Sequence, residues 1–201
     1  MWIDSEEALR ALYGPAGEAS LAKEVPALTP QYRALVEASP FCVLATSGPG
    51  GLDATPRGDP PGFIRVLDDT TLLIPDRRGN NRIDSLLYVV RDPRVALLIL
   101  VPGVAETLRV NGRGRITTDP ALLEPAAVDG KVPVTGLVVT VESVYFQCAK
   151  ALVRSRLCDP SAHRDRADLP TPGEMLKGAK AGFDAEAYDK ALPARLAVSL
   201  Y

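Results

Sequence analysis

Short apolar runs separated by Gly, Pro and Asp dominate the chain between residues 41 and 146. Runs of this kind, with turn-forming residues between them, are typical of β-strands joined by short connections. Six runs each predict a strand: Phe41–Thr46, Phe63–Leu67, Thr71–Pro75, Val95–Val101, Thr107–Thr117 and Leu137–Phe146. Strands with hairpin-length connections predict an antiparallel sheet that closes into a small barrel.

Two of the predicted strands have distinct side-chain patterns. In the fifth, polar residues alternate with apolar residues or glycine, so four polar side chains share one face: Arg109, Asn111, Arg113 and Arg115. A solvated strand face is the ordinary explanation of such a pattern. In the sixth, β-branched residues occupy both faces, which indicates a strand inside the sheet or at an interface.

Helical patterns flank and interrupt the strands. Near the start, Ser5 precedes a helix-like stretch, and Thr29 can cap a second helix that begins at Pro30. After Gly79, apolar residues recur at the spacing of a helix packed on one side: Ile83, Leu86, Leu87 and Val90. Further helical stretches are expected near Glu174–Lys180 and Asp184–Leu192.

These patterns predict one domain in three parts. Residues 1–39 form a helical segment that packs on the barrel, and residues 40–158 form the barrel itself. Residues 159–201, richer in proline and charge, form a helical extension of the same domain.

Composition and charge exclude several kinds of site. The 201 residues carry a formal net charge of −2, so the overall balance favours neither nucleic acid nor a membrane surface as partner. A single histidine, His163, excludes multi-histidine metal sites. The three cysteines form no CxxC pair, which argues against a disulfide scaffold or a thiolate metal cage.

The expected location is the cytoplasm, with no membrane attachment. No basic and apolar leader is visible at the start, and free cysteines fit a reducing compartment. The longest apolar stretch, Val95–Val101, is far shorter than the roughly 20 residues that a spanning helix needs.

The densest polar segment, Pro75–Arg82, joins a predicted strand to a predicted helix. A helix N-terminus offers unpaired N–H groups and the positive end of a dipole. Asn80 and Asn81 can donate from their side chains, and Arg82 can pair with a phosphate through two hydrogen bonds. The segment predicts a phosphate site; the alternative is that an Asn caps the helix and the arginines are solvated.

Two further segments carry cations. Turn-forming residues fill Thr55–Arg65, which is either a plain turn or a stiff loop that holds Arg57 in place. Lys150 and Arg154 lie on one face if their segment is helical. Because like charges at that spacing repel, a shared anion would explain the pair.

The motifs that are missing narrow the function further. The chain has no GxGxxG, GxxxxGK[ST], GxSxG or HExxH motif. A single histidine and no paired carboxylates give little support to hydrolysis or general acid–base catalysis. A redox enzyme whose cofactor carries the electron chemistry needs only a shaped pocket and an anchor for that cofactor, which cationic clusters can provide.

Four segments together resemble the pyridoxamine 5′-phosphate oxidase-like family, and more narrowly its branch of probable FMN-dependent enzymes: Ala54–Asp59, Ile74–Arg82, Glu106–Gly112, and Cys148–Ala151 with Arg154 and Ser155. The resemblance implies a mainly β (α+β) split β-barrel of antiparallel strands with flanking helices. It also implies a homodimer that holds one FMN at each of two sites between the subunits.

The resemblance implies a set of cofactor-binding residues. Those expected along the isoalloxazine ring and ribityl chain are Ile74 and Pro75. Those expected at the phosphate are Asn80, Asn81 and Arg82, assisted by Arg57 or Arg65. Thr107 would approach the flavin, and Lys150 and Arg154 would come from the partner subunit. No catalytic residue and no metal ligand is assigned.

The chain departs from the branch at two positions that border the flavin or substrate pocket in the family. Cys158 stands where an aromatic residue, typically Trp, is usual, and Gln147 stands where His is usual. Outside the site, Cys148 is expected to be a buried structural thiol, and His163 an exposed loop residue.

The leading hypothesis is an FMN-dependent oxidoreductase that transfers two electrons to or from an unknown small organic substrate. One alternative is a deazaflavin-dependent reductase on the same fold. Others are a non-catalytic flavin- or heme-binding module and a structural dimer without cofactor. Heme is disfavoured, because His163 is the single possible histidine ligand.

Overall fold

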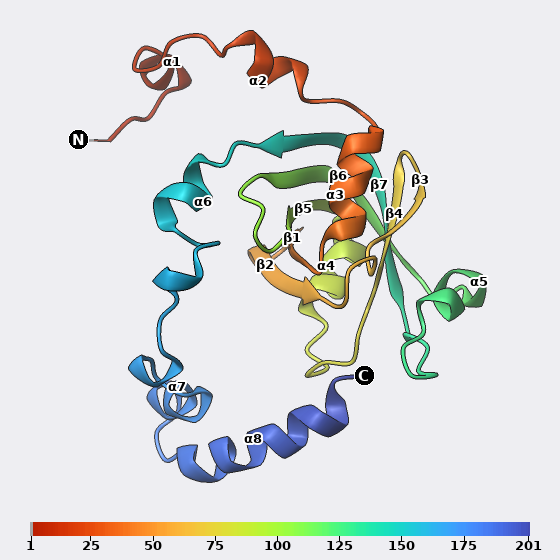
Figure 1. The fold of residues 1–201 in the computed structure, drawn as a ribbon, viewed down its shortest axis with the longest axis vertical. Helices are drawn as coiled ribbons and strands as arrows, with labels where there is room; N and C mark the ends of the chain where they lie inside the picture. The colour runs from red at the N-terminus through yellow and green to blue at the C-terminus, as the bar shows by residue number, and fades with distance from the viewer. Residues whose placement is uncertain (1) are drawn as a thin grey trace.

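In a computed structural model that describes residues 2–201, the strands form one antiparallel sheet of order β2-β1-β5-β6-β7-β4-β3 (Figure 1). The strands are β1 (Phe41–Gly48), β2 (Gly51–Gly58), β3 (Arg65–Asp68), β4 (Thr71–Pro75), β5 (Arg94–Leu100), β6 (Thr107–Thr117) and β7 (Gly136–Gln147). The predicted antiparallel sheet with flanking helices is confirmed. Among the described residues, the strand order ends at β2 on one side and at β3 on the other.

Strand β2 corrects the sequence prediction, which made residues 55–65 a turn-rich segment. The first part of that segment is a strand that pairs with β1, and Pro56 lies opposite Val43. Proline lacks an N–H group, so it is tolerated on an edge strand, where one side needs no partner. Strand β3 begins at Arg65 instead of Phe63, although Phe63 and Ile64 are buried just before it.

The core is one connected cluster of apolar side chains, most of which come from β1, β4, β5, β6 and β7 and the others from helices and loops beside the sheet. In β1 every second residue is buried, which is the pattern of a strand with one face on the core. Cys42 is one of these residues, and burial raises the pKa of its thiol to about 12. The Cys42 thiol is therefore protonated at neutral pH and contributes packing alone.

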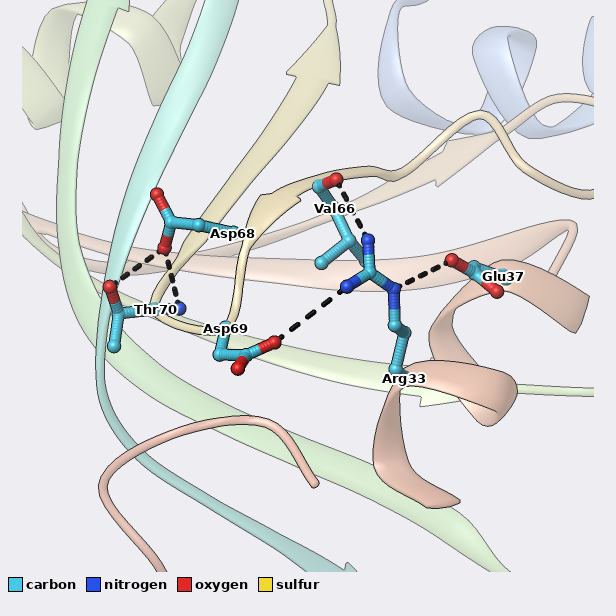
Figure 2. A network of polar contacts seen from close by, with 6 residues as sticks. All are labelled: Arg33, Glu37, Val66, Asp68, Asp69 and Thr70. Carbon is cyan, nitrogen blue, oxygen red and sulfur yellow. Dashed lines mark hydrogen bonds and ion pairs between the residues drawn. The ribbon is translucent and has the colours of Figure 1, made fainter. Parts of the chain in front are cut away.

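Helix α3 (Pro30–Ala38) covers part of this core. The Thr29 hydroxyl accepts a hydrogen bond from the Tyr32 amide, as predicted for an N-cap, and Val36 is fully buried. Figure 2 shows how Arg33 links α3 to the β3–β4 hairpin, with an ion pair to Asp69 (3.7 Å) and a hydrogen bond to the Val66 carbonyl (3.4 Å). These exposed contacts fix orientation more than they add stability.

The turn of the same hairpin is held by its own side chains. The Asp68 carboxylate accepts hydrogen bonds from the Thr70 amide and from the Thr70 hydroxyl (Figure 2). Both bonds favour the ionised form, so the pKa of Asp68 lies below its ordinary value.

Helix α4 (Asp84–Arg91) packs against β1 with a face that differs from the predicted one. Ser85 and Val89 are buried, whereas Ile83, Leu87 and Val90 are exposed. Two contacts hold this face: the Ser85 hydroxyl accepts a hydrogen bond of 2.7 Å from Arg57 of β2, and Val89 joins the apolar core.

The remaining helices extend away from the sheet (Figure 1). They are α1 (Glu6–Arg10), α2 (Glu18–Ala22), α5 (Pro120–Leu123), α6 (Lys150–Ser155), α7 (Pro172–Ala179) and α8 (Ala185–Ser199). Helices α1, α2, α6 and α8 contain no buried residue. None of the helices in residues 2–201 has the length and apolar character to cross a membrane. The part boundaries at residues 39 and 158 stay a prediction.

Candidate functional site

A cavity of about 940 Å³ lies beside the edge strand β2. Its walls come from residues 53–55 and 57 of β2, the segment 76–86 that leads into α4, the segment 131–135 before β7, and Tyr201. Four of the residues predicted for the phosphate line it: Arg57, Asn80, Asn81 and Arg82. The volume is in the range of cavities that enclose small ligands.

Arg57 is a cation of this cavity that its neighbours hold in place. Its side chain is 23% exposed, and its Nη2 atom donates a hydrogen bond to the Ser85 hydroxyl at 2.7 Å. The same nitrogen lies 3.8 Å from an Asp76 carboxylate oxygen. The guanidinium is therefore held in place before any ligand arrives, which lowers the entropic cost of binding an anion.

The loop before α4 has an unusual backbone. Asn81 and Ile83 both have positive φ, at 61° and 43°. The Asn80 side chain accepts a hydrogen bond from the Arg82 amide. The N-cap of α4 is Ile83, which provides no side-chain cap, so the interpretation of an Asn as the helix cap is wrong. The first N–H groups of α4 are thus left for a ligand or solvent.

Arg82, another residue predicted at the phosphate, is exposed and already pairs with a carboxylate. Its side chain is 76% exposed and its guanidinium donates two hydrogen bonds to one Asp84 carboxylate oxygen. A phosphate at this position would compete with Asp84, so we expect Arg82 to contribute less than Arg57.

The charge of the cavity wall favours an anionic ligand. Five cations line it against three carboxylates: Arg57, Arg77, Arg78, Arg82 and Lys131 against Asp53, Asp76 and Asp84. An excess of one sign in a concave site attracts ligands of the opposite sign. No group of three or more His, Cys, Asp and Glu in residues 2–201 is placed to hold a metal ion.

Asp76 is one of the three carboxylates in this cationic wall. Burial raises the pKa of its carboxyl above the ordinary value, and the nearby Arg57 guanidinium lowers the pKa by a smaller amount. The folded protein therefore holds the Asp76 proton to a higher pH than the unfolded chain, in which the pKa is about 3.9. As the pH rises from that value through the raised folded pKa, the folded state loses stability relative to the unfolded state.

Replacement of Asp76 by Asn removes this pH-dependent loss. The difference in unfolding free energy, Asp76→Asn minus wild type, is expected to grow as the pH rises from about 4 and to level off above the folded pKa. Urea denaturation of both proteins at several pH values between 3.5 and 7 measures it. A difference that stays constant or shrinks with rising pH would contradict the raised pKa.

The other predicted site residues do not line this cavity. Arg65 donates from Nη1 to the Leu122 carbonyl at 2.9 Å. Ile74 and Pro75 are buried in β4, immediately before the cavity loop. The remaining three lie elsewhere: Thr107 is buried at the start of β6, and Lys150 and Arg154 are exposed on α6.

Thr107 does not line the cavity, although the residue after it is in register with Arg57. Leu108 pairs with Ile99, Ile99 with Cys42, and Cys42 with Arg57. Three strand spacings, roughly 15 Å, therefore separate the start of β6 from the Arg57 wall of the cavity. The other end of β6 leads to the opposite wall: Thr117 pairs with Gly136, which also pairs with Pro75 just before the cavity loop.

Among the cavity residues that the sequence reasoning missed, three are polar side chains with a partner in the site: Ser85, Lys131 and Tyr201. Ser85 lay in a segment interpreted only as an apolar helix, so its hydroxyl had no assigned role. Lys131 and Tyr201 had no local signal, because the fold alone brings them beside β2 and the loop before α4.

The structure also tests the remaining cysteine and histidine predictions. Cys148 is exposed, so the prediction of a buried thiol is wrong; it follows the end of β7, where no element covers it. His163 is exposed at the end of a short 3₁₀ helix, Pro160–Ala162, as predicted. Cys158 is half-buried, with its Sγ atom 3.7 Å from the Val104 carbonyl oxygen.

The fold and the cavity define a class: an antiparallel sheet protein with flanking helices and a cationic cavity beside an edge strand. Residues 28–148 match the family model described as pyridoxamine 5′-phosphate oxidase. The chain therefore belongs to the pyridoxamine 5′-phosphate oxidase family, as its motifs predicted. No curated protein matches the chain.

Solved structures with a similar fold share little sequence with this chain. HupZ of Group A Streptococcus is 16% identical, over 59% of this chain and 93% of HupZ, with a TM-score of 0.49. A candidate pyridoxamine 5′-phosphate oxidase of Lactobacillus delbrueckii is 20% identical, over 60% and 95%, with a TM-score of 0.47. An F420 reductase is 17% identical, over 60% and 98%, with a TM-score of 0.44.

Proposed function

We propose that the cavity binds FMN and that the protein is an FMN-dependent oxidoreductase acting on a small organic substrate. The observation that carries this proposal is the pairing of a pre-positioned Arg57 with the uncapped N-terminus of α4 at one cavity. Both features favour a phosphate group. Membership of the pyridoxamine 5′-phosphate oxidase family supports a flavin as the molecule that carries this phosphate.

In this proposal, some residues of the cavity bind the phosphate directly, as an anchor, and others surround it. Arg57 and the Ser85 hydroxyl hold the phosphate, and the segment Asn80–Arg82 surrounds it. Ile74 and Pro75 end the strand that leads to the anchor; their side chains are buried, so in this proposal the backbone at the end of β4 would lie along the ribityl chain and the ring. When bound, FMN would supply the two-electron chemistry by accepting or donating a hydride.

The chain itself contributes binding and orientation. His163 is exposed and is not among the residues that line the cavity, so no histidine stands there as a proton donor or acceptor. The Asp76 carboxyl in the cavity has a raised pKa and lies beside the Arg57 guanidinium. We therefore assign Asp76 a role in positioning Arg57 at the anion site. All three cysteines are free, in keeping with the cytoplasmic location that we propose.

Titration with separate ligands tests this function. The purified protein is expected to bind FMN with a shift in flavin absorbance or fluorescence, and to bind it more tightly than riboflavin, which lacks the phosphate. Tighter binding of deazaflavin F420 would favour the reductase alternative, and binding of hemin alone would favour a heme module. A protein that binds none of them would contradict the proposal.

A second assay separates an enzyme from a binding module. The FMN-loaded protein is mixed anaerobically with NADH or NADPH, and separately with small organic substrates, while flavin absorbance is followed. Reduction of the bound flavin, followed by its reoxidation with turnover, supports the oxidoreductase. Flavin that stays oxidised with every donor would instead support a non-catalytic module.

We also propose that two copies of the chain associate through the outer face of β1, β5, β6 and β7. Strand register aligns four outward side chains in one row: Val43, Leu98, Arg109 and Tyr145. Arg109 donates a hydrogen bond of 2.8 Å to the Tyr145 hydroxyl and its guanidinium lies over that ring. Aromatic and Arg side chains among small apolar neighbours are typical of subunit interfaces.

A second copy would also supply groups that do not line the cavity of their own chain. Thr107 begins β6, and Lys150 and Arg154 are exposed on α6. In the homodimer that we propose, these residues reach the FMN site of the partner, which places each cofactor between the subunits. Family membership supports this arrangement.

Leu98→Glu tests the dimer surface. Leu98 is 36% exposed in the single chain, and a carboxylate there would be desolvated at the interface without a partner. Sedimentation velocity is expected to show wild type at twice the 21.4 kDa chain mass and the variant as monomer with less bound FMN. Leu52→Glu, at an 88% exposed residue of the β1–β2 hairpin, is the control. A Leu98→Glu dimer as stable as wild type would contradict this surface.

A further inference from the structure

The chain after β7 leaves the sheet and then returns to it. Figure 1 shows the path through α6 and α7 in an arc and back along α8 toward the sheet. Helices α7 and α8 pack on each other, and the Asp189 carboxylate accepts hydrogen bonds from the Thr171 hydroxyl and the Gly173 amide. Because α8 has no buried residue, packing of this helix does not hold it against the sheet.

Tyr201 makes the contact at which this arm returns. Its hydroxyl donates a hydrogen bond of 2.6 Å to the Asp59 carboxylate, and its backbone oxygen accepts one of 2.9 Å from the Lys131 ammonium. The Arg77 guanidinium lies 5.7 Å from the centre of its ring. Three segments distant in sequence therefore converge on one aromatic residue that also lines the cavity.

The partner of the Tyr201 hydroxyl is a carboxylate with little access to solvent. The Asp59 side chain is 2% exposed, and one of its oxygens pairs with Arg77. In the described part of the chain, the Tyr201 hydroxyl is the hydrogen-bond donor to the other oxygen. A buried carboxylate oxygen without a donor is costly, so Asp59 favours the state in which Tyr201 is docked.

This hydrogen bond also affects Tyr201 itself. The Asp59 carboxylate accepts a hydrogen bond from the phenol, which stabilises the protonated phenol and raises the pKa of Tyr201 above its ordinary value. The phenol therefore remains a donor throughout the neutral range, and the contact does not depend on a nearby change of pH.

We propose that Tyr201 forms a strap that closes one side of the cavity and must release before the bound cofactor exchanges. The role in exchange rests on the proposed FMN site. Release breaks the contacts with Asp59, Lys131 and Arg77 but uncovers no core, because the preceding helix is unburied. Opening is thus a local event, whose free energy is set by these polar contacts and lies below that of global unfolding.

The docking is tested without any ligand. Hydrogen–deuterium exchange of residues 195–201 is compared in wild type, Tyr201→Phe, Tyr201→Ala and the control Tyr188→Phe. Tyr188 lies on α8, outside the cavity lining, where its ring packs on Phe183. Exchange at residues 195–201 is expected to be faster in both Tyr201 variants, more so in Tyr201→Ala, and unchanged in Tyr188→Phe. Equal exchange in all four proteins would overturn the docking.

The exchange role is tested by stopped-flow release of FMN into excess competitor. Loss of the hydroxyl is expected to speed FMN dissociation about three- to tenfold, and loss of the ring to speed it further. Tyr188→Phe should release FMN at the wild-type rate. If wild type binds FMN and all variants release it equally fast, the strap does not control exchange, although the FMN site stands. If wild type binds no FMN, both the site and the exchange role fall.

Discussion

Replacing Arg57 by Met is expected to weaken FMN binding about a hundredfold. Arg57 is mostly buried, fixed on Ser85, and central to the cationic wall, so its loss leaves the phosphate without its main partner. Truncation of a hydrogen-bonded charge in a buried site typically costs 2–5 kcal/mol, about 1.4 kcal/mol for each factor of ten in affinity. Fluorescence titration with FMN measures the change.

Riboflavin and two other arginines are the controls for Arg57. Riboflavin has the same ring and no phosphate, so its affinity should change little in Arg57→Met. Arg65→Met tests the other predicted phosphate residue, which bonds Leu122 and does not line the cavity. Arg91→Met, at the far end of α4, should bind FMN as wild type does. Equal losses for FMN and riboflavin would contradict a phosphate role for Arg57.

Gly112→Ala is expected to lower the free energy of unfolding by about 3 kcal/mol. Gly112 lies at a register shift between β6 and β7, where a Cβ atom would be 2.1 Å from the Thr140 carbonyl oxygen. The obstacle is backbone of the neighbouring strand, so no side-chain rotation can relieve it. The two central strands would have to separate locally, and urea denaturation measures the cost.

Gly178→Ala is the matched control for Gly112→Ala. Gly178 lies in α7, where a Cβ atom would have no neighbour within 4 Å, so alanine there fills open space. Alanine in an exposed helix is expected to raise stability by about 0.5–1 kcal/mol. If the two variants had equal stability, the close approach of β7 at Gly112 would not be the constraint that we describe.

The sequence predicted the strands in which the polarity of each side chain matches its burial. Strand β6 was recognised because Arg109 and Arg113 alternate with apolar or glycine residues, and burial in the folded sheet preserves that alternation. Strand β4 was recognised from its short apolar run, which is buried at four of five positions. Local pattern is enough when side-chain polarity and burial agree.

Strand β2 and the face of α4 could not be predicted in the same way. Residues 51–58 form an edge strand with no buried residue, so their sequence shows little apolar character. Their extended conformation comes from pairing with β1. In α4, the apolar spacing predicted that Ile83 and Val90 face the core. The buried residues are instead Ser85, which accepts a hydrogen bond from Arg57, and Val89. Both outcomes depend on contacts between segments that the local sequence does not encode.

The sequence predicted the part of the candidate site whose residues are adjacent in the chain, and missed the part that only folding brings together. Asn80, Asn81 and Arg82 are adjacent in sequence, and Gly79 marks the loop, so a local motif reveals them. Lys131 and Tyr201 join them only through folding, over separations that no spacing rule covers. Thr107 and Lys150 do not line the cavity of the single chain, and the homodimer that we propose would bring them to it.

A crystal structure of the protein with FMN tests the central claim most directly, because it locates the phosphate. We expect a phosphate oxygen within hydrogen-bond distance of the Arg57 guanidinium, with the segment Asn80–Arg82 and the first turn of α4 around it. An ordered FMN whose phosphate contacts none of these groups would contradict the account.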